Sequence, residues 1–359
     1  MIEPTPIVAK MQAFPLADMS APAGKRVIRL AQNESAFPPS PRAVAAAQDA
    51  LIDPTAYPDP GWSALRQAIG QAYSVDPELI LCSAGSMDVI AALIQAFVGP
   101  GDRVLSTAHG YGYFKTAALF AGAEYDSVPE PGLVVSVDLL LEAVQPTTRI
   151  VAVANPGNPT GTRISRTELL RLRDGLPDDV ILLIDEAYAE FTDPLGEQMF
   201  DLVDRGNTVV TRSFSKAYAL AGQRIGWGLF PSELGVHARK LLTPGGVTHA
   251  SLAAAQAAVK DQDYLAWLVR ATAAIRESFA DGLARIDLAP LPSHTNFVLV
   301  PFDSVEAAES ARLAMQEEAI IVRPMGAYAL PDCLRITIDA SEDMDFTLKV
   351  LTKWKGTPS

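Results

Sequence analysis

A lysine follows an apolar run in segment 211–226, which reads Thr-Arg-Ser-Phe-Ser-Lys-Ala-Tyr-Ala-Leu-Ala-Gly-Gln-Arg-Ile-Gly. The run 207–211 predicts a buried strand, so Lys216 is expected just past a strand end, where open α/β sheets bind their ligands. A buried ammonium is costly unless a charge offsets it or the chemistry removes it. Hydroxyls and a planar cation that suit a phosphate dianion lie nearby, at Ser213, Ser215 and Arg224. An amine beside such donors indicates a phosphorylated aldehyde bound as a Schiff base, with an exposed loop lysine as the alternative.

Two other apolar runs end in side chains that could hold an aromatic ring. Run 180–185 is five apolar residues and an aspartate, which is typical of a central parallel strand that delivers Asp185 to its C-terminal edge. This carboxylate needs a cationic partner, and a protonated pyridine nitrogen would be one, unless Asp185 only caps a helix. After run 149–154, the loop Asn-Pro-Gly-Asn-Pro-Thr-Gly is rigid enough to aim the Asn158 amide at a ring oxygen, unless it is only a structural turn.

Two further loops follow predicted strands and suit an anion and a ring. Small residues join strand 79–82 to an apolar helix over 87–98, and the free N–H groups of such a turn favour a bound anion. The candidate phosphate contacts in this turn are Gly85, Ser86 and Met87. After strand 103–107, glycines on both sides free Tyr111 to present its ring face to a pyridine, with Tyr113 as the alternative.

Composition restricts the class of protein. The chain has 359 residues, enough for one large or two packed domains, and 49% of them are apolar, which is ordinary for a globular protein. Its 29 basic and 42 acidic residues give a formal charge of −13, which argues against nucleic acid and anionic membranes as main partners.

Neither a metal site nor an oxidising compartment is indicated. The only cysteines, Cys82 and Cys333, lie in separate apolar runs, and the four histidines lack ligand spacing. The first residues do not read as a secretory signal, and no apolar run approaches the roughly 20 residues that span a bilayer. We therefore expect a cytoplasmic protein without a metal.

In these motifs the chain resembles the fold-type I pyridoxal-phosphate enzymes, and among them the histidinol-phosphate aminotransferase family. The resemblance covers about residues 30 to 338. It implies an α/β fold with a large domain built on a mostly parallel seven-stranded sheet and a small α+β domain. It also implies pyridoxal 5′-phosphate as the cofactor, attached to Lys216 as a Schiff base.

Three regions are expected along the chain. They are an N-terminal arm over 1–40 that packs with the small domain, a large cofactor-binding domain over 41–245 and a small C-terminal domain over 246–359. The pattern predicts a helix over 41–52, a helical region over 251–288 and a helix over 304–317. Strands are predicted over 295–300, 320–323 and 334–338.

The resemblance extends to residues that spacing alone does not single out. Tyr188 matches a tyrosine that bonds the ring oxygen of the cofactor. Tyr57, in Tyr-Pro-Asp-Pro-Gly, matches one that reaches the cofactor phosphate of the neighbouring subunit, which implies a homodimer with shared active sites. The alternative for Tyr57 is a tyrosine packed under a proline turn.

Three residues match the substrate site of the family. Asn33 lies in a segment near the substrate, although a simple helix-entry turn explains it equally well. Arg335 and Arg323 match arginines that bind a substrate carboxylate or phosphate, with solvent-facing arginines on an edge strand as the alternative.

Three departures from the family pattern concern the substrate. A tyrosine that helps to bind histidinol phosphate corresponds to Ala13-Phe14, which has no hydroxyl. A pocket segment is replaced by the more polar Pro-Gly-Gly-Val-Thr-His of 244–249, and the phosphate loop reads Gly-Ser-Met-Asp over 85–88. Specificity for histidinol phosphate therefore does not follow from the resemblance.

The sequence thus predicts an aminotransferase that uses Lys216, Asp185 and Tyr111 as catalytic residues. It would move an amino group between a donor, histidinol phosphate or an aromatic or other amino acid, and a 2-oxo acid such as 2-oxoglutarate, as in histidine biosynthesis. One alternative is a decarboxylase of the threonine-phosphate type on the same scaffold. Another is a catalytically idle binding protein or regulator, against which the intact lysine and aspartate count.

Overall fold

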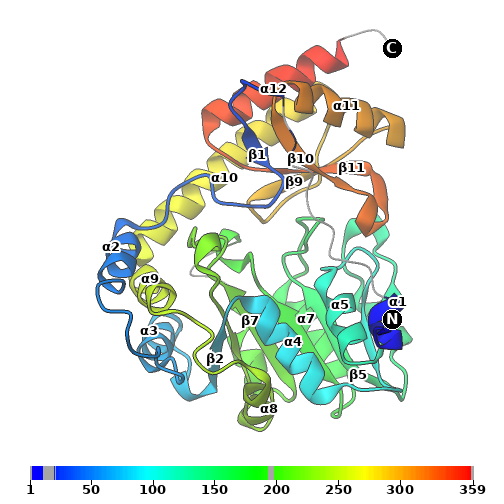
Figure 1. Cartoon of the computed structure of the whole chain (residues 1–359). Helices are drawn as coiled ribbons and strands as arrows, with labels where there is room; N and C mark the ends of the chain where they lie inside the picture. The colour runs from blue at the N-terminus through cyan, green and yellow to red at the C-terminus, as the bar shows by residue number, and fades with distance from the viewer. Residues whose placement is uncertain (1, 11–19, 21, 193–197, 357–359) are drawn as a thin grey trace.

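A computed structural model describes residues 2–10, 20, 22–192 and 198–356 (Figure 1). The predicted departure at Ala13-Phe14 lies outside these residues. Two lobes, each built on its own sheet, are stacked one above the other in Figure 1.

The larger lobe contains a seven-stranded sheet. Its spatial order is β2 (Ile80–Ser83), β8 (Gly226–Leu229), β7 (Thr208–Ser213), β6 (Ile181–Asp185), β5 (Thr148–Ala154), β3 (Arg103–Thr107) and β4 (Glu124–Val128). Strand β8 runs antiparallel to both of its neighbours, and the remaining pairs are parallel. The central strands are buried along their whole length, which explains their nearly continuous apolar sequences.

Helices pack on this sheet and beside it. They are α4 (Ser86–Phe97), α5 (Tyr113–Phe120), α6 (Val137–Ala143), α7 (Arg166–Gly175) and α8 (Ser232–Ala238), with the short α1 (Pro6–Lys10) against α5. A separate group at the left of Figure 1 contains α2 (Pro41–Asp49), α3 (Ser63–Tyr73) and α9 (His249–Lys260).

The smaller lobe combines both ends of the chain. Its four strands lie in the order β1 (Ile28–Leu30), β10 (Ile320–Met325), β11 (Leu330–Thr337) and β9 (Phe297–Pro301). Strand β1 pairs parallel to β10, while β11 is antiparallel to both of its neighbours. Helices α11 (Val305–Glu317) and α12 (Ser341–Lys355) cover this sheet (Figure 1).

Helix α10 (Gln262–Ala284) joins the two lobes. Its Leu265, Leu268 and Val269 belong to the core around the large sheet. Its Phe279 and Leu283 belong to the core around the small sheet. At about 1.5 Å per residue, one straight helix of this length is long enough to enter both cores.

The predicted fold class is confirmed by these two sheets and their helices. The predicted helical region 251–288 contains the end of α9 and the whole of α10, and the chain bends between them at Asp261 (φ −98°, ψ 62°). There the Ser40 hydroxyl donates a hydrogen bond of 2.5 Å to the Asp261 carboxylate. Ser40 is also the N-cap of α2, so the bend fastens α2 to the α9–α10 junction.

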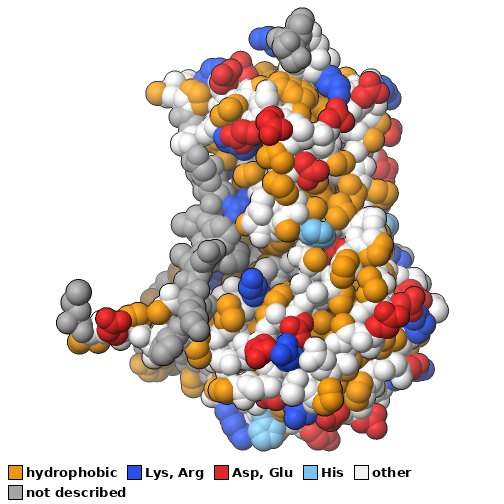
Figure 2. Space-filling view, turned by 90° about the vertical axis from the view of Figure 1, so that its right-hand side faces the viewer, with side chains coloured by type: hydrophobic (Ala, Val, Ile, Leu, Met, Phe, Trp, Pro, Cys, Tyr) orange, Lys and Arg blue, Asp and Glu red, His pale blue; other side chains and the backbone are white. Residues whose placement is uncertain are grey.

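Acidic and basic side chains are mixed over both lobes on the face drawn in Figure 2, without a broad patch of one sign among the side chains described there. Within the part of the chain that the structure describes, no helix is both long and apolar enough to cross a bilayer.

Candidate active site

A cavity of about 510 Å³ opens between the lobes, at the C-terminal ends of the parallel strands. Both lobes line it, and it receives polar side chains from the ends of β2, β3, β5, β6 and β7, from the segment after β1, and from β10 and β11. Most of the residues predicted from the sequence face it, namely Asn33, Ser86, Met87, Tyr111, Asn158, Asp185, Tyr188, Ser213, Ser215, Lys216, Arg224, Arg323 and Arg335. Such a concave site, with a few convergent polar groups, is the usual form of a small-molecule site.

Lys216 lies in the loop that follows β7, partly exposed to this cavity. Its Nζ donates hydrogen bonds to the carbonyl oxygens of Gln32 (3.2 Å) and Asn33 (3.0 Å). Loss of hydration lowers the pKa of Lys216 to about 7, and the nearby Arg335 and Arg224 also lower it. A large fraction of the amine is therefore neutral and nucleophilic near neutral pH.

Asp185 is the last residue of β6 and is 4% exposed. Its Oδ1 accepts a hydrogen bond of 2.9 Å from the hydroxyl of Thr211, the residue paired with it on β7. Burial raises the pKa of this carboxyl to about 6, because no ion pair reaches it within the described parts of the chain. A cation placed against Asp185 would offset this cost and hold it ionised.

The turn before α4 and the loop after β7 form an anion cradle. Gly85 has a φ of +113°, and a Cβ there would come within 2.7 Å of Arg224 Nη2. A Cβ on Gly226 would collide with the backbone nitrogen of Ser86. These two glycines let the first turn of α4, whose N–H groups have no intrahelical acceptor, approach the Arg224 guanidinium.

Hydroxyl groups complete the cradle from the other side. Arg224 Nη1 donates to the Ser215 hydroxyl (3.3 Å) and to the Ala221 carbonyl (3.1 Å). The backbone N–H of Ser215 donates to the Ser213 hydroxyl at 3.1 Å. The predicted phosphate contacts are thus brought together, and the cradle suits a dianion bearing several acceptor oxygens.

Aromatic and amide groups line the space between Lys216 and Asp185. Tyr111 lines the cavity and packs edge-on against Phe114, whereas Tyr113 lines a second cavity beside Trp62. Burial raises the pKa of Tyr111 well above its usual range, so its phenol stays protonated. Tyr188 is 4% exposed, and its hydroxyl accepts a hydrogen bond of 2.8 Å from Asn33 Nδ2.

Arginines from the small sheet close the cavity. Arg335 is 7% exposed, and its Nη1 donates to Asn158 Oδ1 (2.6 Å) while its Nη2 donates to the Ala31 carbonyl (2.9 Å). Its Nε is buried without an acceptor among the described residues. Arg323 pairs with Arg335 in the ladder of β10 and β11 and lines the same cavity. This arrangement offers positive charge to an anionic ligand group.

The surroundings of other predicted residues leave their roles as predictions. Asn33 lines the cavity, and its side chain is hydrogen-bonded to the hydroxyls of Tyr188 and Thr337, so its contact with substrate stays a prediction. Tyr57 is 95% exposed and does not line the cavity of its own chain. Segment 244–249 lies by the second cavity, where His249 Nε2 contacts the Ala56 carbonyl at 3.0 Å.

Some lining residues were not anticipated from the sequence. The carbonyls of Gln32 and Asn33 bind the lysine amine, and Tyr328 contributes an aromatic side chain; Thr211, which binds Asp185 from behind the lining, was not anticipated either. Tyr328 lies between the strands that carry the two predicted arginines, and that position is the signal that could have found it.

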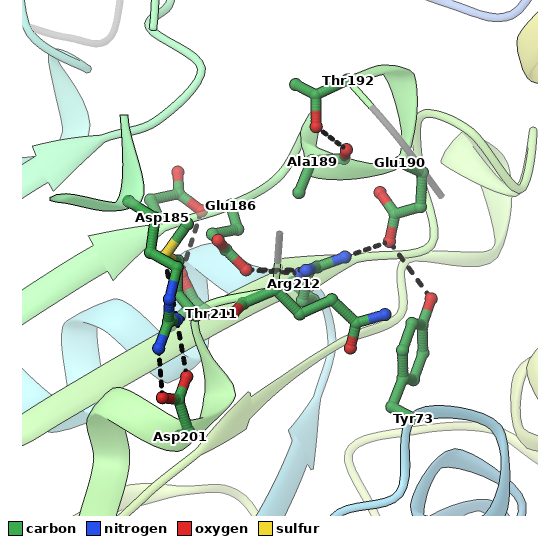
Figure 3. Close-up of polar contacts among 12 residues, drawn as sticks. Tyr73, Asp185, Glu186, Ala189, Glu190, Thr192, Asp201, Thr211 and Arg212 are labelled. Carbon is green, nitrogen blue, oxygen red and sulfur yellow. Dashed lines mark hydrogen bonds and ion pairs between the residues drawn. The ribbon is translucent and has the colours of Figure 1, made fainter. Parts of the chain in front are cut away.

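A buried ionic cluster lies behind the site (Figure 3). The Arg212 guanidinium, 3% exposed, forms ion pairs with Glu186 (2.7 Å) and Glu190 (2.9 Å). The Tyr73 hydroxyl contacts Glu190 at 3.3 Å and the Tyr218 hydroxyl at 2.5 Å. Asp185 faces the cavity, whereas Glu186, which follows it, and Arg212, which follows Thr211 on β7, belong to the cluster, because successive side chains of an extended segment point to opposite faces.

Comparison with known proteins identifies the family. Residues 25–351 match the family "Aminotransferase class I and II". A histidinol-phosphate aminotransferase of Jannaschia sp. (strain CCS1) is 40% identical over 325 residues, covering 90% of each chain. One from Rhodospirillum centenum (strain ATCC 51521 / SW) is 40% identical over 356 residues, covering 98% of each chain.

A solved structure agrees with these sequence relatives. The histidinol-phosphate aminotransferase of Sinorhizobium meliloti, in complex with pyridoxal-5′-phosphate, superposes with a TM-score of 0.91 at 29% identity, covering 98% of this chain and 97% of that chain. The chain belongs to the class I and II aminotransferases, and it is a pyridoxal-phosphate-dependent aminotransferase. The predicted family is confirmed, and the alternative decarboxylase is not favoured.

We expect that replacing the central cation of the buried cluster strongly destabilises the fold. Arg212→Met leaves Glu186 and Glu190 buried without their ion-pair partner, which costs about 3–5 kcal/mol. The loss is measured as a shift of the urea unfolding transition. Arg171→Met, which removes two solvent-exposed ion pairs, with Asp138 and Glu168, is the control and should shift the transition little. Equal shifts for the two variants would contradict this account of the cluster.

We expect Lys216 of the cofactor-free protein to react with acetic anhydride at half its maximal rate near pH 7, where burial places its pKa. Lysines with an ordinary pKa near 10.4 label appreciably only at much higher pH. Peptide mapping of the label over a pH series measures this labelling rate, and a midpoint near pH 10 would refute the prediction.

The lowered pKa of Lys216 also affects stability. Because this amine binds fewer protons in the folded protein than in the unfolded chain, its contribution to the free energy of unfolding should rise with pH from about 7 towards 10.5, the ordinary pKa of a lysine.

Proposed function

We propose that the cavity holds the cofactor with Lys216 as its covalent attachment point. The observation that carries this assignment is the juxtaposition of a desolvated amine, a buried carboxylate without a cation and an anion cradle in one cavity. We assign the phosphate contacts to Gly85, Ser86, Met87, Ser213, Ser215 and Arg224. We assign the ring contacts to Tyr111, Asn158, Asp185 and Tyr188.

Asp185 would face the ring nitrogen in this arrangement. Its carboxyl is buried and has no ion pair among the described residues, so a protonated ring nitrogen would supply a charge that lowers its pKa. The Thr211 hydroxyl fixes the orientation of the carboxylate. When bound, pyridoxal phosphate supplies an electron sink for the pair of electrons left on a deprotonated carbon.

Lys216 would also act as the general base and acid. In its neutral form, Nζ can accept the proton from the α-carbon of the amino donor and later release it. The two carbonyl oxygens that accept its hydrogen bonds hold the amine at the cavity wall. A pKa near 7 lets one group perform both proton transfers at physiological pH.

We propose histidinol phosphate as the amino donor and 2-oxoglutarate as the acceptor, in histidine biosynthesis. The names of the relatives that are 40% identical over nearly the whole chain support this donor. Arg335 and Arg323 would bind its anionic group, and they equally suit the carboxylate of 2-oxoglutarate. Aromatic amino acids are the competing donors, because the cavity also presents Tyr111 and Tyr328.

We propose a homodimer in which Tyr57 reaches the cofactor phosphate of the neighbouring subunit. Tyr57 is almost fully exposed, which is unusual for an aromatic side chain unless a partner covers it. Phe120 and Leu241, which line the second cavity, are also about half exposed.

We also propose the division into an arm (1–40), a large domain (41–245) and a small domain (246–359). The pairing of β1 with β10 supports packing of the arm with the small domain. Because α10 enters both cores, it is the connection along which the lobes would move. The free, buried Cys82 and Cys333 support a reducing, cytoplasmic compartment.

The cofactor assignment predicts one covalent adduct. Borohydride reduction of protein supplied with pyridoxal 5′-phosphate should fix the cofactor to Lys216, and peptide mapping should find it there. Lys216→Arg should yield no stable adduct, because a guanidinium does not form the Schiff base. An adduct at another lysine of the unmodified protein, or none, would refute the assignment.

The donor assignment predicts a preference in the first half-reaction. Mixing the loaded enzyme with single donors should convert the cofactor spectrum fastest with histidinol phosphate, and 2-oxoglutarate should then restore it. Phenylalanine is the matched competitor, since it offers an aromatic side chain without phosphate. If histidinol phosphate reacts no faster than phenylalanine, the enzyme remains an aminotransferase, but with a different donor.

A further inference from the structure

A hydrogen bond from a residue that does not line the cavity joins the large lobe to a residue of the small lobe that does. His109, in the loop after β3, places its Nδ1 2.7 Å from the carbonyl oxygen of Tyr328 in the small lobe. A carbonyl can only accept, so Nδ1 carries the proton. His109 does not itself line the cavity, whereas Tyr328 does.

The large lobe holds His109 in a defined position. A Cβ on Gly110 would come within 2.9 Å of the Thr107 hydroxyl and 3.0 Å of the Ser106 hydroxyl, so glycine permits a tight turn at this point. The buried carboxyl of Glu130 accepts hydrogen bonds from the Thr107 hydroxyl and the His109 backbone N–H. The tight turn and the hydrogen bonds to Glu130 therefore fix the backbone that carries the His109 imidazole.

The acceptor belongs to the segment that carries the proposed substrate contacts. The short helix η7 (Gly326–Tyr328) connects β10, which bears Arg323, to β11, which bears Arg335. The ring of Tyr328 lies 3.7–3.9 Å from the position that a Cβ on Gly112 would take. The loop after β3 thus meets Tyr328 at both its backbone and its ring, at the edge of the cavity.

We propose that His109 is a positioning residue that fastens η7 over the cavity through this hydrogen bond. With η7 held in place, the Tyr328 ring and the two flanking arginines, Arg323 and Arg335, are oriented toward the amino donor. The proposal rests on the proposed function insofar as these side chains meet the substrate. Lys216, Asp185 and the anion cradle are held by other contacts, so the hydrogen bond of His109 does not fasten them directly.

The proposal predicts that loss of this hydrogen bond weakens binding of the amino donor without slowing the chemical step. Without the hydrogen bond, the segment samples open positions, and donor binding must close it again. The cost is that of one neutral hydrogen bond, which corresponds to a roughly 3- to 10-fold rise in the KM for the donor. The kcat at saturating donor and the binding of the cofactor should remain unchanged.

The test compares two substitutions of the same residue. His109→Leu removes the donor atom, whereas His109→Asn keeps an N–H close to the position of Nδ1. We expect the Leu variant to show the rise in KM and faster deuterium exchange of peptides spanning residues 323–335. The Asn variant should restore both properties. His237→Leu is the control, because His237 is exposed on α8 and contacts Lys240, and it should change neither property.

Three results would overturn the proposal. They are a KM for His109→Leu within twofold of the unmodified enzyme, unchanged deuterium exchange at 323–335, or an Asn variant as impaired as the Leu variant. If His109→Leu does not fold, His109→Gln replaces it, because its amide lies one methylene further out. Failure of the proposed function is recognised separately, as the absence of the Lys216 adduct or of a half-reaction in the unmodified enzyme.

Discussion

The site depends on one physical constraint, the removal of water from the amine of Lys216. Lys216 belongs to the large lobe, yet its hydrogen-bond acceptors, Gln32 and Asn33, follow the strand that joins the small sheet. The cations that help to lower its pKa also come from both lobes, Arg224 from the large one and Arg335 from the small one. The chemistry of this amine is therefore a property of the assembled pair of lobes, and either lobe alone would leave it hydrated and protonated.

The alternation of side chains along β6 and β7 explains how the carboxyl of Asp185 and the guanidinium of Arg212 are both buried close to each other. Asp185, at the end of β6, faces the cavity and is bonded by Thr211 of β7, whereas the residues that follow these two, Glu186 and Arg212, form an ion pair on the opposite face. The Arg212 cluster neutralises part of the charge behind the sheet and fixes the strand ends against each other. In this way Asp185 is held in position by Thr211 without an ion pair among the described residues, while Arg212 is paired with glutamates instead.

Residues that belong to local motifs could be predicted from the sequence, since a strand followed by a loop places its polar residue at one sheet edge. Lys216, Asp185 and Asn158 are of this kind, and all three reach the cavity. Features that depend on distant segments could not be predicted. The bend at Asp261 depends on contact with Ser40, and the role of Asn33 depends on Tyr188 and Thr337.

The parallel pairing of β1 with β10 has a consequence for the order in which the molecule is made. Nearly 300 residues separate Ile28 from its partner Ile320, so a growing polypeptide leaves the ribosome with its first strand unpaired until almost all of the chain has been translated. The segment that accepts the hydrogen bonds of the lysine amine directly follows that strand. During biosynthesis, the large sheet can thus form before the Lys216 amine acquires its final surroundings, which makes the lowered pKa of this amine a late acquisition of the folding chain.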